Sequence, residues 1–432
     1  MEQLAAALDA TAIDGLDRLS GGASRETWRF DAVHADGRRD PLVLRRDPPG
    51  RPGSLDVEAR AIAAAFAAGL PVPEVLAGPD TAGGLVMRRI EGETIARRIL
   101  RDDQYAPARR VLAEQCGRFL AGLHALDLDA TGLADLARPD PLALCRDNLG
   151  LVGEASPTFE LAFRWLDANR PPPPDRDVVV HGDFRLGNLI VGPEGLRAVL
   201  DWELVHAGDP VEDLGWLCVK AWRFGAELPV GGFGTREQLL GAYCAAGGAD
   251  VELGTLRWWE VLNTLKWGIG CMGQAAAHLR GAVRSVELAA IGRRVCEQEW
   301  DLLLLLAPEV AVRGDQPSAA PAGDLHGRPT LDELLEAVAE FLRDDVMPGT
   351  EGRLSFHARV AANVVDTARR EIALGPAQAA RRTGELAGLG VGSEAELAAA
   401  VCRGDLDDRY DELVAVLVSG VVAKLAVANP RY

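Results

Sequence analysis

The amino-acid sequence predicts an α+β protein that ends in an all-α helical bundle. Short β-like runs separated by turn residues dominate the first 90 residues, and helical spacing of apolar residues dominates from about 95 to 310. A stretch rich in proline and glycine, RGDQPSAAPAGDLHGRP, then precedes further helical segments. We therefore expect an N-terminal lobe at 1–90, a second lobe at 91–310, a linker at 311–328 and an all-α domain at 329–432.

The first segment predicts strands and one helix. A glycine-containing turn at Ser20 to Ser24 is followed by the runs TWRFDAV, PLVLRR and GLVMRRI. Before the last of these, VEARAIAAAFAAG predicts a helix at about Leu55 to Ala68, with a glycine suited to its C-terminal cap. This order of elements is typical of a small α+β unit rather than of repeating βαβ units.

A polar segment of the second lobe lies between two β-like runs. DVVV precedes HGDFRLGN, which runs from His181 to Asn188, and LRAVLDW follows it. The prolines at 171–174 just before these runs mark a stiff connection, because proline has no backbone N–H for a helix. Most of the remaining lobe is predicted to be helical, with AEQCGRFLAGLHALD as a clear amphipathic stretch.

The last hundred residues predict helices alone. Thr330 and Glu333 form a capping-box pattern before apolar residues at helical spacing. Further helices are expected at roughly 353–373, 376–388, 393–403 and 408–428.

Composition excludes several classes of partner. A net charge of −18 disfavours nucleic acid and anionic membranes, and no apolar run is long enough to span a bilayer. The seven cysteines show no metal-ligand spacing, and the N-terminus lacks a basic signal region, so we expect a cytoplasmic protein with free thiols. Only three lysines occur, all after residue 219, so a cation needed earlier in the chain must be arginine.

The segment HGDFRLGN carries residue types suited to phosphoryl transfer. Such a reaction needs a carboxylate at the attacking hydroxyl and oxygen ligands for magnesium. Asp183 and Asn188 stand five residues apart, the separation seen in the kinase motif HRDxxxxN, and Asp201 follows a hydrophobic strand. We predict that Asp183 is the catalytic carboxylate and that Asn188 and Asp201 bind Mg²⁺.

Neighbouring residues allow two interpretations each. Glu203 would be a second metal ligand if the chain stays extended beyond Asp201. Arg185 either contacts a phosphate or an anionic substrate group, or is a solvated loop cation. For His181 we favour a structural role, bracing the loop by hydrogen bonds, over a chemical one.

The segment VVVHGDFRLGNLIVGPEGLRAVLDWELVHAGDPVEDLGW resembles the signature of the aminoglycoside phosphotransferase-like kinases, a superfamily related to choline kinase and protein kinases. The resemblance covers about residues 10–305 and includes GDPxxDLG downstream. It implies a protein-kinase-like two-lobed fold that holds ATP and Mg²⁺ between its lobes. It also implies structural roles for Asp209 and Asp213.

The same resemblance implies a nucleotide site in the first lobe. The segment LSGGASRETWRF is similar to the family's nucleotide loop, which implies that backbone amides contact phosphate at four small residues: Ser20, Gly21, Gly22 and Ser24. Kinases pair a strand lysine with a helix glutamate, and here Arg45 and Glu58 take those positions. Arg46 is the alternative to Arg45 as the strand cation, but side chains alternate along a strand, so the two lie on opposite faces. Met87 would lie near the adenine.

Within the superfamily, VLRR, PPG and HGDFRLGN are most similar to kinase-like domains associated with acyl-CoA dehydrogenases. That resemblance implies a hydroxyacyl or other metabolic hydroxyl as the substrate. The C-terminal segment resembles a small helical domain of unknown function fused to such kinases. Its residues Arg353, His357, Arg359 and Asn363 form either a polar site or a solvated helix face.

Three functions remain open at this point. The first is an ATP- and Mg²⁺-dependent phosphotransferase that acts on a small-molecule hydroxyl. The second is a nucleotide-binding pseudokinase whose helical C-terminal domain binds a protein partner, suggested by arginine at position 45. The third is an aminoglycoside phosphotransferase, since an acidic protein suits a polycationic drug.

Overall fold

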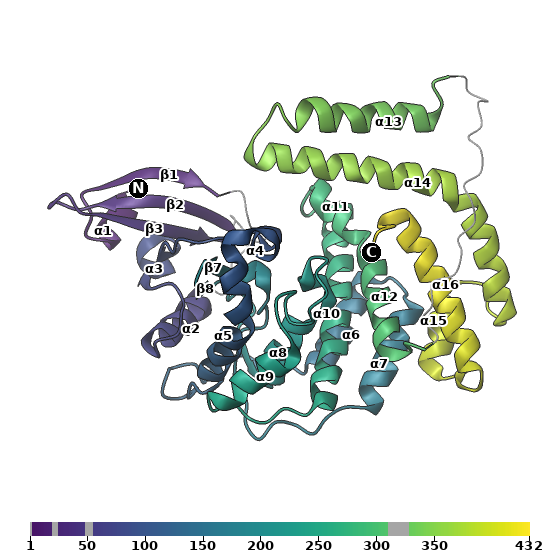
Figure 1. Cartoon of the computed structure of the whole chain (residues 1–432), viewed down its shortest axis with the longest axis horizontal. Coiled ribbons are helices and arrows are strands. Elements are labelled where there is room, and N and C mark those ends of the chain that lie inside the picture. Colours follow the sequence, from purple (N-terminus) through teal and green to yellow (C-terminus); the bar gives the residue numbers. More distant parts are fainter. Residues whose placement is uncertain (1, 20–24, 48–54, 310–327) are drawn as a thin grey trace. The chain divides into compact units, whose positions relative to one another are not determined.

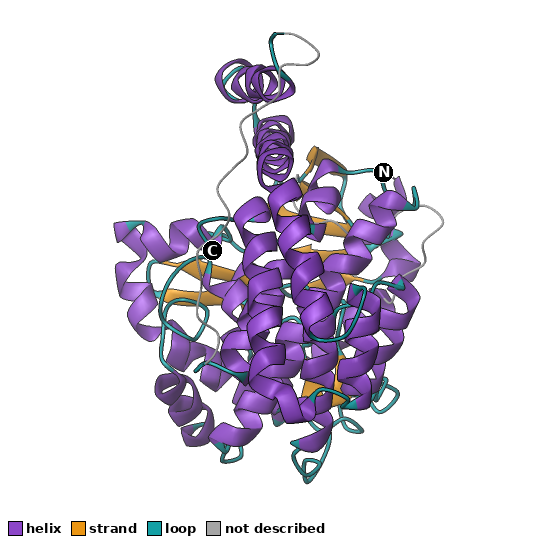
Figure 2. Ribbon diagram, turned by 90° about the vertical axis from the view of Figure 1, so that its right-hand side faces the viewer, coloured by secondary structure: helices purple, strands orange, loops and turns teal. Residues whose placement is uncertain are grey.

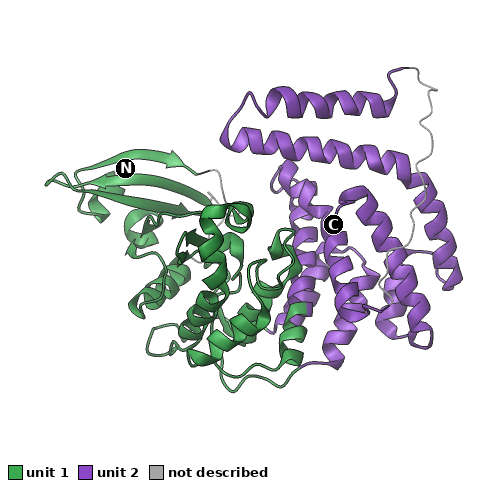
Figure 3. Ribbon diagram, in the orientation of Figure 1, with its two compact units in different colours: residues 1–139, 171–260 green, residues 140–170, 261–432 purple. Residues whose placement is uncertain are grey.

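The computed structural model of the chain describes residues 2–19, 25–47, 55–309 and 328–432. It divides into two compact units, one formed by residues 1–139 and 171–260 and the other by residues 140–170 and 261–432 (Figure 3). Helices account for most of the described chain and strands for a minority (Figure 2). The predicted α+β fold with a helical C-terminal region is confirmed. The residues 261–309 lie in the same unit as the C-terminal helices.

The first unit begins with a five-stranded antiparallel sheet in the order β1-β2-β3-β5-β4 (Figure 1). Its strands are β1 (Ala12–Arg18), β2 (Glu26–Val33), β3 (Arg39–Arg46), β4 (Val75–Ala77) and β5 (Leu85–Arg88). Along β3, Leu42 and Leu44 are buried in a cluster with Phe30 and Val86. Because side chains alternate along a strand, Val43 and Arg45 lie on the other face.

Three helices accompany this sheet: α1 (Glu2–Ala7), α2 (Leu55–Ala67) and α3 (Pro79–Ala82). Leu4 of α1 and Ala82 of α3 join the cluster around Leu42. Helix α2 matches the predicted helix to within one residue and buries Glu58 and Ile62 completely. A carboxylate at zero exposure requires cationic partners, which the sheet supplies.

The rest of the first unit surrounds the HGDFRLGN loop. Its helices are α4 (Ala96–Arg101), α5 (Ala106–His124), α8 (Val211–Cys218) and α9 (Arg236–Ala245), and α10 (Leu253–Leu279) begins there and continues into the second unit. Two small antiparallel sheets pair β6 (Val178–Val180) with β9 (His206–Gly208) and β7 (Leu189–Gly192) with β8 (Gly195–Val199). The predicted runs around the loop are therefore confirmed as β6 and β8.

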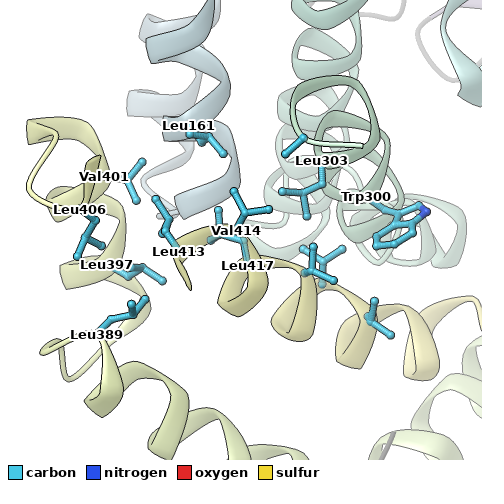
Figure 4. Packing of buried hydrophobic residues seen from close by; sticks show 14 of the residues in the cluster. Leu161, Trp300, Leu303, Leu389, Leu397, Val401, Leu406, Leu413, Val414 and Leu417 are labelled. Atoms are coloured by element: carbon cyan, nitrogen blue, oxygen red, sulfur yellow. The ribbon is translucent and has the colours of Figure 1, made fainter. Parts of the chain in front are cut away.

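The second unit is helical throughout its described residues. Besides most of α10 it contains α6 (Pro141–Val152), α7 (Pro157–Ala168), α11 (Val286–Gly292), α12 (Val295–Leu306), α13 (Leu331–Phe341), α14 (Gly352–Gly388), α15 (Glu394–Arg403) and α16 (Tyr410–Ala428), with a π-helical turn, η4 (Leu342–Val346), after α13. One hydrophobic core joins α7 and α12 to α15 and α16, and Figure 4 shows Leu161, Leu303, Val401 and Leu413 directed into it.

The C-terminal helices follow the sequence prediction except at Pro376. The capping box at Thr330 and Glu333 is formed as predicted. However, α14 continues through Pro376, where a break between two helices was expected. Proline removes one helical hydrogen bond, and long helical stretches on both sides of it keep α14 continuous. On α13, four apolar side chains remain exposed: Leu331, Leu334, Val338 and Phe341.

Candidate active site

The HGD turn is fixed by buried polar groups. Gly182 adopts a φ of +80°, and a Cβ there would lie 2.6 Å from the carbonyl oxygen of Leu204, so only glycine fits. The backbone N–H groups of His181 and Gly182 donate to the two carboxylate oxygens of Asp213, at 2.8 and 2.9 Å. Asp213 lies on α8 and is fully buried. One carboxylate thus holds both residues that precede Asp183.

His181 braces the same loop from inside. Its Nε2 lies 3.0 Å from the carbonyl oxygen of Leu200, and its Nδ1 accepts from the backbone N–H of Asp183 at 3.2 Å. Burial lowers the pKa of His181, although the nearby Asp213 and Asp183 carboxylates oppose that shift. A neutral imidazole with its proton on Nε2 satisfies both contacts. This geometry accords with the structural role favoured for His181.

Among the described residues, three donors surround the Asp183 carboxylate. Oδ1 accepts from the indole Nε1 of Trp216 at 2.8 Å and from Nε of Arg185 at 3.0 Å. Oδ2 accepts from the side-chain amide of Asn188 at 2.6 Å. Only 13% of the Asp183 side chain is exposed, so its hydrogen bonds to protein groups fix its direction.

The strand pair β7–β8 brings Asn188 close to the segment that carries Asp201. Leu189 pairs with Val199, and the N–H of Leu200 donates to the carbonyl oxygen of Asn188 at 2.8 Å. Asp201 follows at once with a φ of +67°, a backbone conformation that is uncommon outside glycine and is often found at functional sites. The two predicted metal ligands therefore sit at one end of the same hairpin.

The donor set fits Mg²⁺. The amide nitrogen of Asn188 bonds to Asp183, which leaves its amide oxygen for a cation, and Oδ2 of Asp201 accepts no hydrogen bond from the described residues. One amide and one carboxylate match the few protein ligands that Mg²⁺ takes beside phosphates and water. No cluster of three or more His, Cys, Asp or Glu side chains suited to a metal occurs among the described residues.

Arg45 joins the sheet to the segment that carries Asp201. Its Nη1 donates to Glu58, and its Nη2 donates to Oδ1 of Asp201 at 2.8 Å. Burial acts to lower the pKa of Arg45, but the carboxylates of Glu58 and Asp201 outweigh it and raise the pKa, so the guanidinium stays charged. The structure therefore places arginine where kinases pair lysine with the helix glutamate.

Sequence reasoning missed a second cation at Glu58. Arg25 donates to Oε2 of Glu58 and, through Nε, to Asp47 at 2.9 Å. Its side chain is only 7% exposed. The one sequence signal for Arg25 is its place directly after the predicted nucleotide loop.

The remaining predicted nucleotide and metal residues lie in different surroundings. Met87 is buried on β5 opposite Val43, whereas Arg46 is exposed. Glu203 lies within electrostatic reach of Arg45, but the chain is not extended at Asp201, so strand alternation gives no reason to place Glu203 beside it. The predicted loop residues Ser20, Gly21, Gly22 and Ser24 lie outside the described part of the chain.

Arg185 and the polar residues of α14 differ in their surroundings. The guanidinium of Arg185 lies over the ring of Trp222, 4.7 Å from its centroid, and also bonds to Asp183. On α14, Nε2 of His357 lies 3.9 Å from Oε2 of Glu287, and the guanidinium of Arg359 lies over the ring of Phe356. Arg353 and Asn363 share this helix and are exposed. The structure thus places Arg185 at the site, while a site on α14 stays a prediction.

Replacing Asp213 by asparagine is expected to lower the free energy of unfolding at pH 7 by about 3 kcal/mol, because an amide cannot accept from both loop N–H groups and His124. Burial acts to raise the pKa of Asp213, but its hydrogen bonds, above all the one to His124, lower it overall. A carboxylate whose pKa is lowered by folding stabilises the fold at pH values above its ordinary pKa of 3.8. This contribution is lost as the pH falls through the lower pKa of the folded state.

Urea unfolding of the wild type and Asp213→Asn at pH 7 and at progressively lower pH measures this difference. The gap between the two proteins should close below about pH 4. Exposed Asp129, changed to asparagine, is the matched control and should leave stability within about 0.5 kcal/mol. An equal gap at every pH would contradict the assignment.

Relatives of this chain carry acyl-CoA dehydrogenase names. The acyl-CoA dehydrogenase family member 11 of Gallus gallus is 27% identical over 354 residues, covering 73% of this chain and 44% of that protein. The human protein of the same name is 25% identical and covers 79% of this chain and 48% of its own length. The chain therefore spans less than half the length of these curated relatives.

Solved structures share its fold. A putative aminoglycoside phosphotransferase from Ralstonia eutropha JMP134 aligns with a TM-score of 0.54 at 22% identity, covering 70% of this chain and 97% of that one. An aminoglycoside phosphotransferase in complex with GDP and kanamycin aligns with a TM-score of 0.51 at 14% identity, covering 69% and 98%. These likenesses show the kinase-like fold. In the described residues, no helix is both long and apolar enough to cross a membrane.

Family matches cover most of the chain. Residues 348–432 match a domain of unknown function, DUF6285, in the region for which the sequence predicted such a domain. Residues 15–259, which include Asp183, Asn188 and Asp201, match the model of the phosphotransferase enzyme family APH. The predicted resemblance is confirmed: the chain belongs to this phosphotransferase family and carries a kinase-type catalytic domain.

Proposed function

We propose that this chain transfers the γ-phosphoryl group of ATP to a hydroxyl group of a small metabolite and requires Mg²⁺. The observation that carries the proposal is the grouping of Asp183, Asn188 and Asp201 around one hairpin, with Arg45 bonded to both Glu58 and Asp201. A binding module alone has no need of this set.

Each of these residues has its own role in the proposed phosphoryl transfer. Asp183 accepts a hydrogen bond from the acceptor hydroxyl, orients it for in-line attack and takes its proton late in the reaction. Asn188 and Asp201 would hold Mg²⁺, which neutralises charge on the phosphates when it is bound. Arg45 supplies a cation for the phosphates, and its planar guanidinium suits bidentate contact with phosphate oxygens.

The acceptor we propose is a hydroxyacyl thioester or a similar metabolic hydroxyl. Relatives over the catalytic region are named acyl-CoA dehydrogenase family members, and this chain spans less than half of their length. The Arg185 guanidinium beside Asp183 favours an acceptor with anionic groups and disfavours a polycation such as an aminoglycoside. The pseudokinase alternative rested on arginine at position 45, and the contacts of Arg45 with Glu58 and Asp201 argue against it.

The proposal predicts Mg²⁺-dependent transfer of labelled phosphate from γ-labelled ATP to at least one hydroxyacyl-CoA. The measurement incubates the chain with ATP and a panel of hydroxyacyl-CoA thioesters, choline and kanamycin, and detects phosphorylated products by mass spectrometry. EDTA should abolish transfer, and excess Mg²⁺ should restore it. Transfer to kanamycin alone would favour the aminoglycoside alternative, and no transfer to any acceptor would contradict the kinase proposal.

A further inference from the structure

The helix α8 fixes both the backbone and the side chain of the proposed catalytic aspartate. Asp213 and Trp216 stand three residues apart on α8, so they share one helix face. Asp213 accepts from the backbone N–H groups of His181 and Gly182. Trp216 donates to the carboxylate of Asp183 at 2.8 Å. The loop is therefore held before Asp183, and the Asp183 side chain is held separately.

The hydrogen bonds distinguish the two oxygens of the Asp183 carboxylate. Each carboxylate oxygen accepts about two hydrogen bonds. Within the described residues, Oδ1 already accepts two, from Trp216 and Arg185, whereas Oδ2 accepts one, from Asn188. Oδ2 is thus the oxygen with capacity left for an acceptor hydroxyl.

The indole of Trp216 is a rigid donor. Only 4% of Trp216 is exposed, and its ring centroid lies 5.4 Å from that of Trp222, which also packs under the Arg185 guanidinium. An indole N–H can donate but cannot accept, so it cannot compete for the proton of the acceptor. A phenylalanine at this position would fill most of the space without the donor.

We propose that Trp216 is a positioning residue that holds Oδ1 of Asp183 and thereby directs Oδ2 toward the acceptor hydroxyl. The proposal rests on the kinase function proposed above. In the step it supports, the acceptor O–H proton passes to Oδ2 of Asp183 and a new O–P bond forms at the γ-phosphorus. The bond from that phosphorus to the bridging oxygen breaks, and its electron pair leaves with ADP.

The kinetic test compares Trp216→Phe with the wild type, with Mg·ATP turnover to water or to any acceptor from the panel as the assay. Losing a hydrogen bond to a charged group should lower kcat by roughly 10- to 100-fold, while KM for ATP changes less than about twofold. Trp258→Phe is the matched control, because Trp258 lies in the same unit as Trp216 and is also buried, with 2% exposed. That control should keep wild-type kcat. A Trp216→Phe kcat within about twofold of wild type would overturn the proposal.

A spectroscopic test decides the contact without catalysis. In protein labelled with ¹⁵N-tryptophan, the indole resonance of Trp216 should move upfield when Asp183→Asn removes the charged acceptor. It should move further than the eight other indole signals, of which Trp222 responds indirectly through Arg185. If no indole resonance moves, the hydrogen bond is absent and the proposal fails, whether or not Trp216→Phe folds. Absence of turnover in the wild type would instead contradict the kinase function, and the indole shift would still report on the contact.

Discussion

Asp183→Asn is expected to lower kcat for phosphoryl transfer by roughly 10²- to 10⁴-fold, the range that general base catalysis contributes. The asparagine keeps the size of the side chain, but its amide carries no negative charge to accept the hydroxyl proton. The same amide would also have to face the N–H donors of Trp216, Arg185 and Asn188, which now point at a carboxylate. The measurement is steady-state turnover of Mg·ATP with the identified acceptor.

The control for this prediction is stability. ATP binding by Asp183→Asn should stay close to that of the wild type, because Arg45 and Glu58 are unchanged. Its thermal unfolding should remain cooperative but occur at a lower temperature, because Trp216 and Arg185 lose a charged acceptor. Exposed Asp129→Asn should keep full activity. Equal turnover by wild type and Asp183→Asn would mean that Asp183 is not the base and would remove the main support for a catalytic function.

Ending the chain after residue 309 is expected to destroy the fold of the second unit. The core that contains Leu161, Trp300 and Leu303 takes many of its members from the C-terminal helices α15 and α16. The C-terminal helices also supply a polar contact to this core. Nζ of Lys424, on α16, lies 2.9 Å from Oε2 of the buried Glu299. Without α15 and α16 these groups would face water, so we expect an insoluble or aggregated product. Soluble yield and size-exclusion chromatography measure it.

A single substitution in the same core should reduce the stability of the second unit by a smaller amount. Leu413→Ala, at a position only 1% exposed, should lower the free energy of unfolding by about 2–5 kcal/mol through lost burial and a cavity. Leu144→Ala on α6 is the control, since Leu144 is 45% exposed and should cost less than about 0.5 kcal/mol. A monomeric truncated chain with wild-type melting of its remaining helices would contradict the shared core. It would support instead the predicted independent domain at 329–432.

Local patterns predicted the elements more completely than their long-range contacts. The strands β2 and β3, the helix α2 and the capping box of α13 followed from alternation, helical spacing and capping residues. The three-residue strands β4 and β9 were missed, because they lack the run of β-branched valines that marked the equally short β6. Pro376 was overweighted as a helix breaker, since tertiary packing of α14 was not visible in the sequence.

At the candidate site, motif spacing selected the residues proposed for catalysis and metal binding but not the residues that hold them in place. The positions of Asp183, Asn188 and Asp201 came from the order of residues around one hairpin. Arg25 and Trp216 could not be found in that way, because they lie 158 and 33 residues from Asp183 along the chain and meet the site only through tertiary folding. Which atoms a side chain contacts depends on packing that no single-sequence pattern encodes.

The guanidinium of Arg45 should also couple the binding of Mg²⁺ to the binding of the nucleotide. Asp201 already has a positive neighbour at 2.8 Å, so a lone divalent cation meets a carboxylate whose charge is largely compensated. If the chain binds a nucleotide as proposed, the phosphates would give that guanidinium new partners and would free the carboxylate at the same moment. Arriving together, the cation and the nucleotide should each strengthen the binding of the other, and the free enzyme should hold Mg²⁺ only weakly.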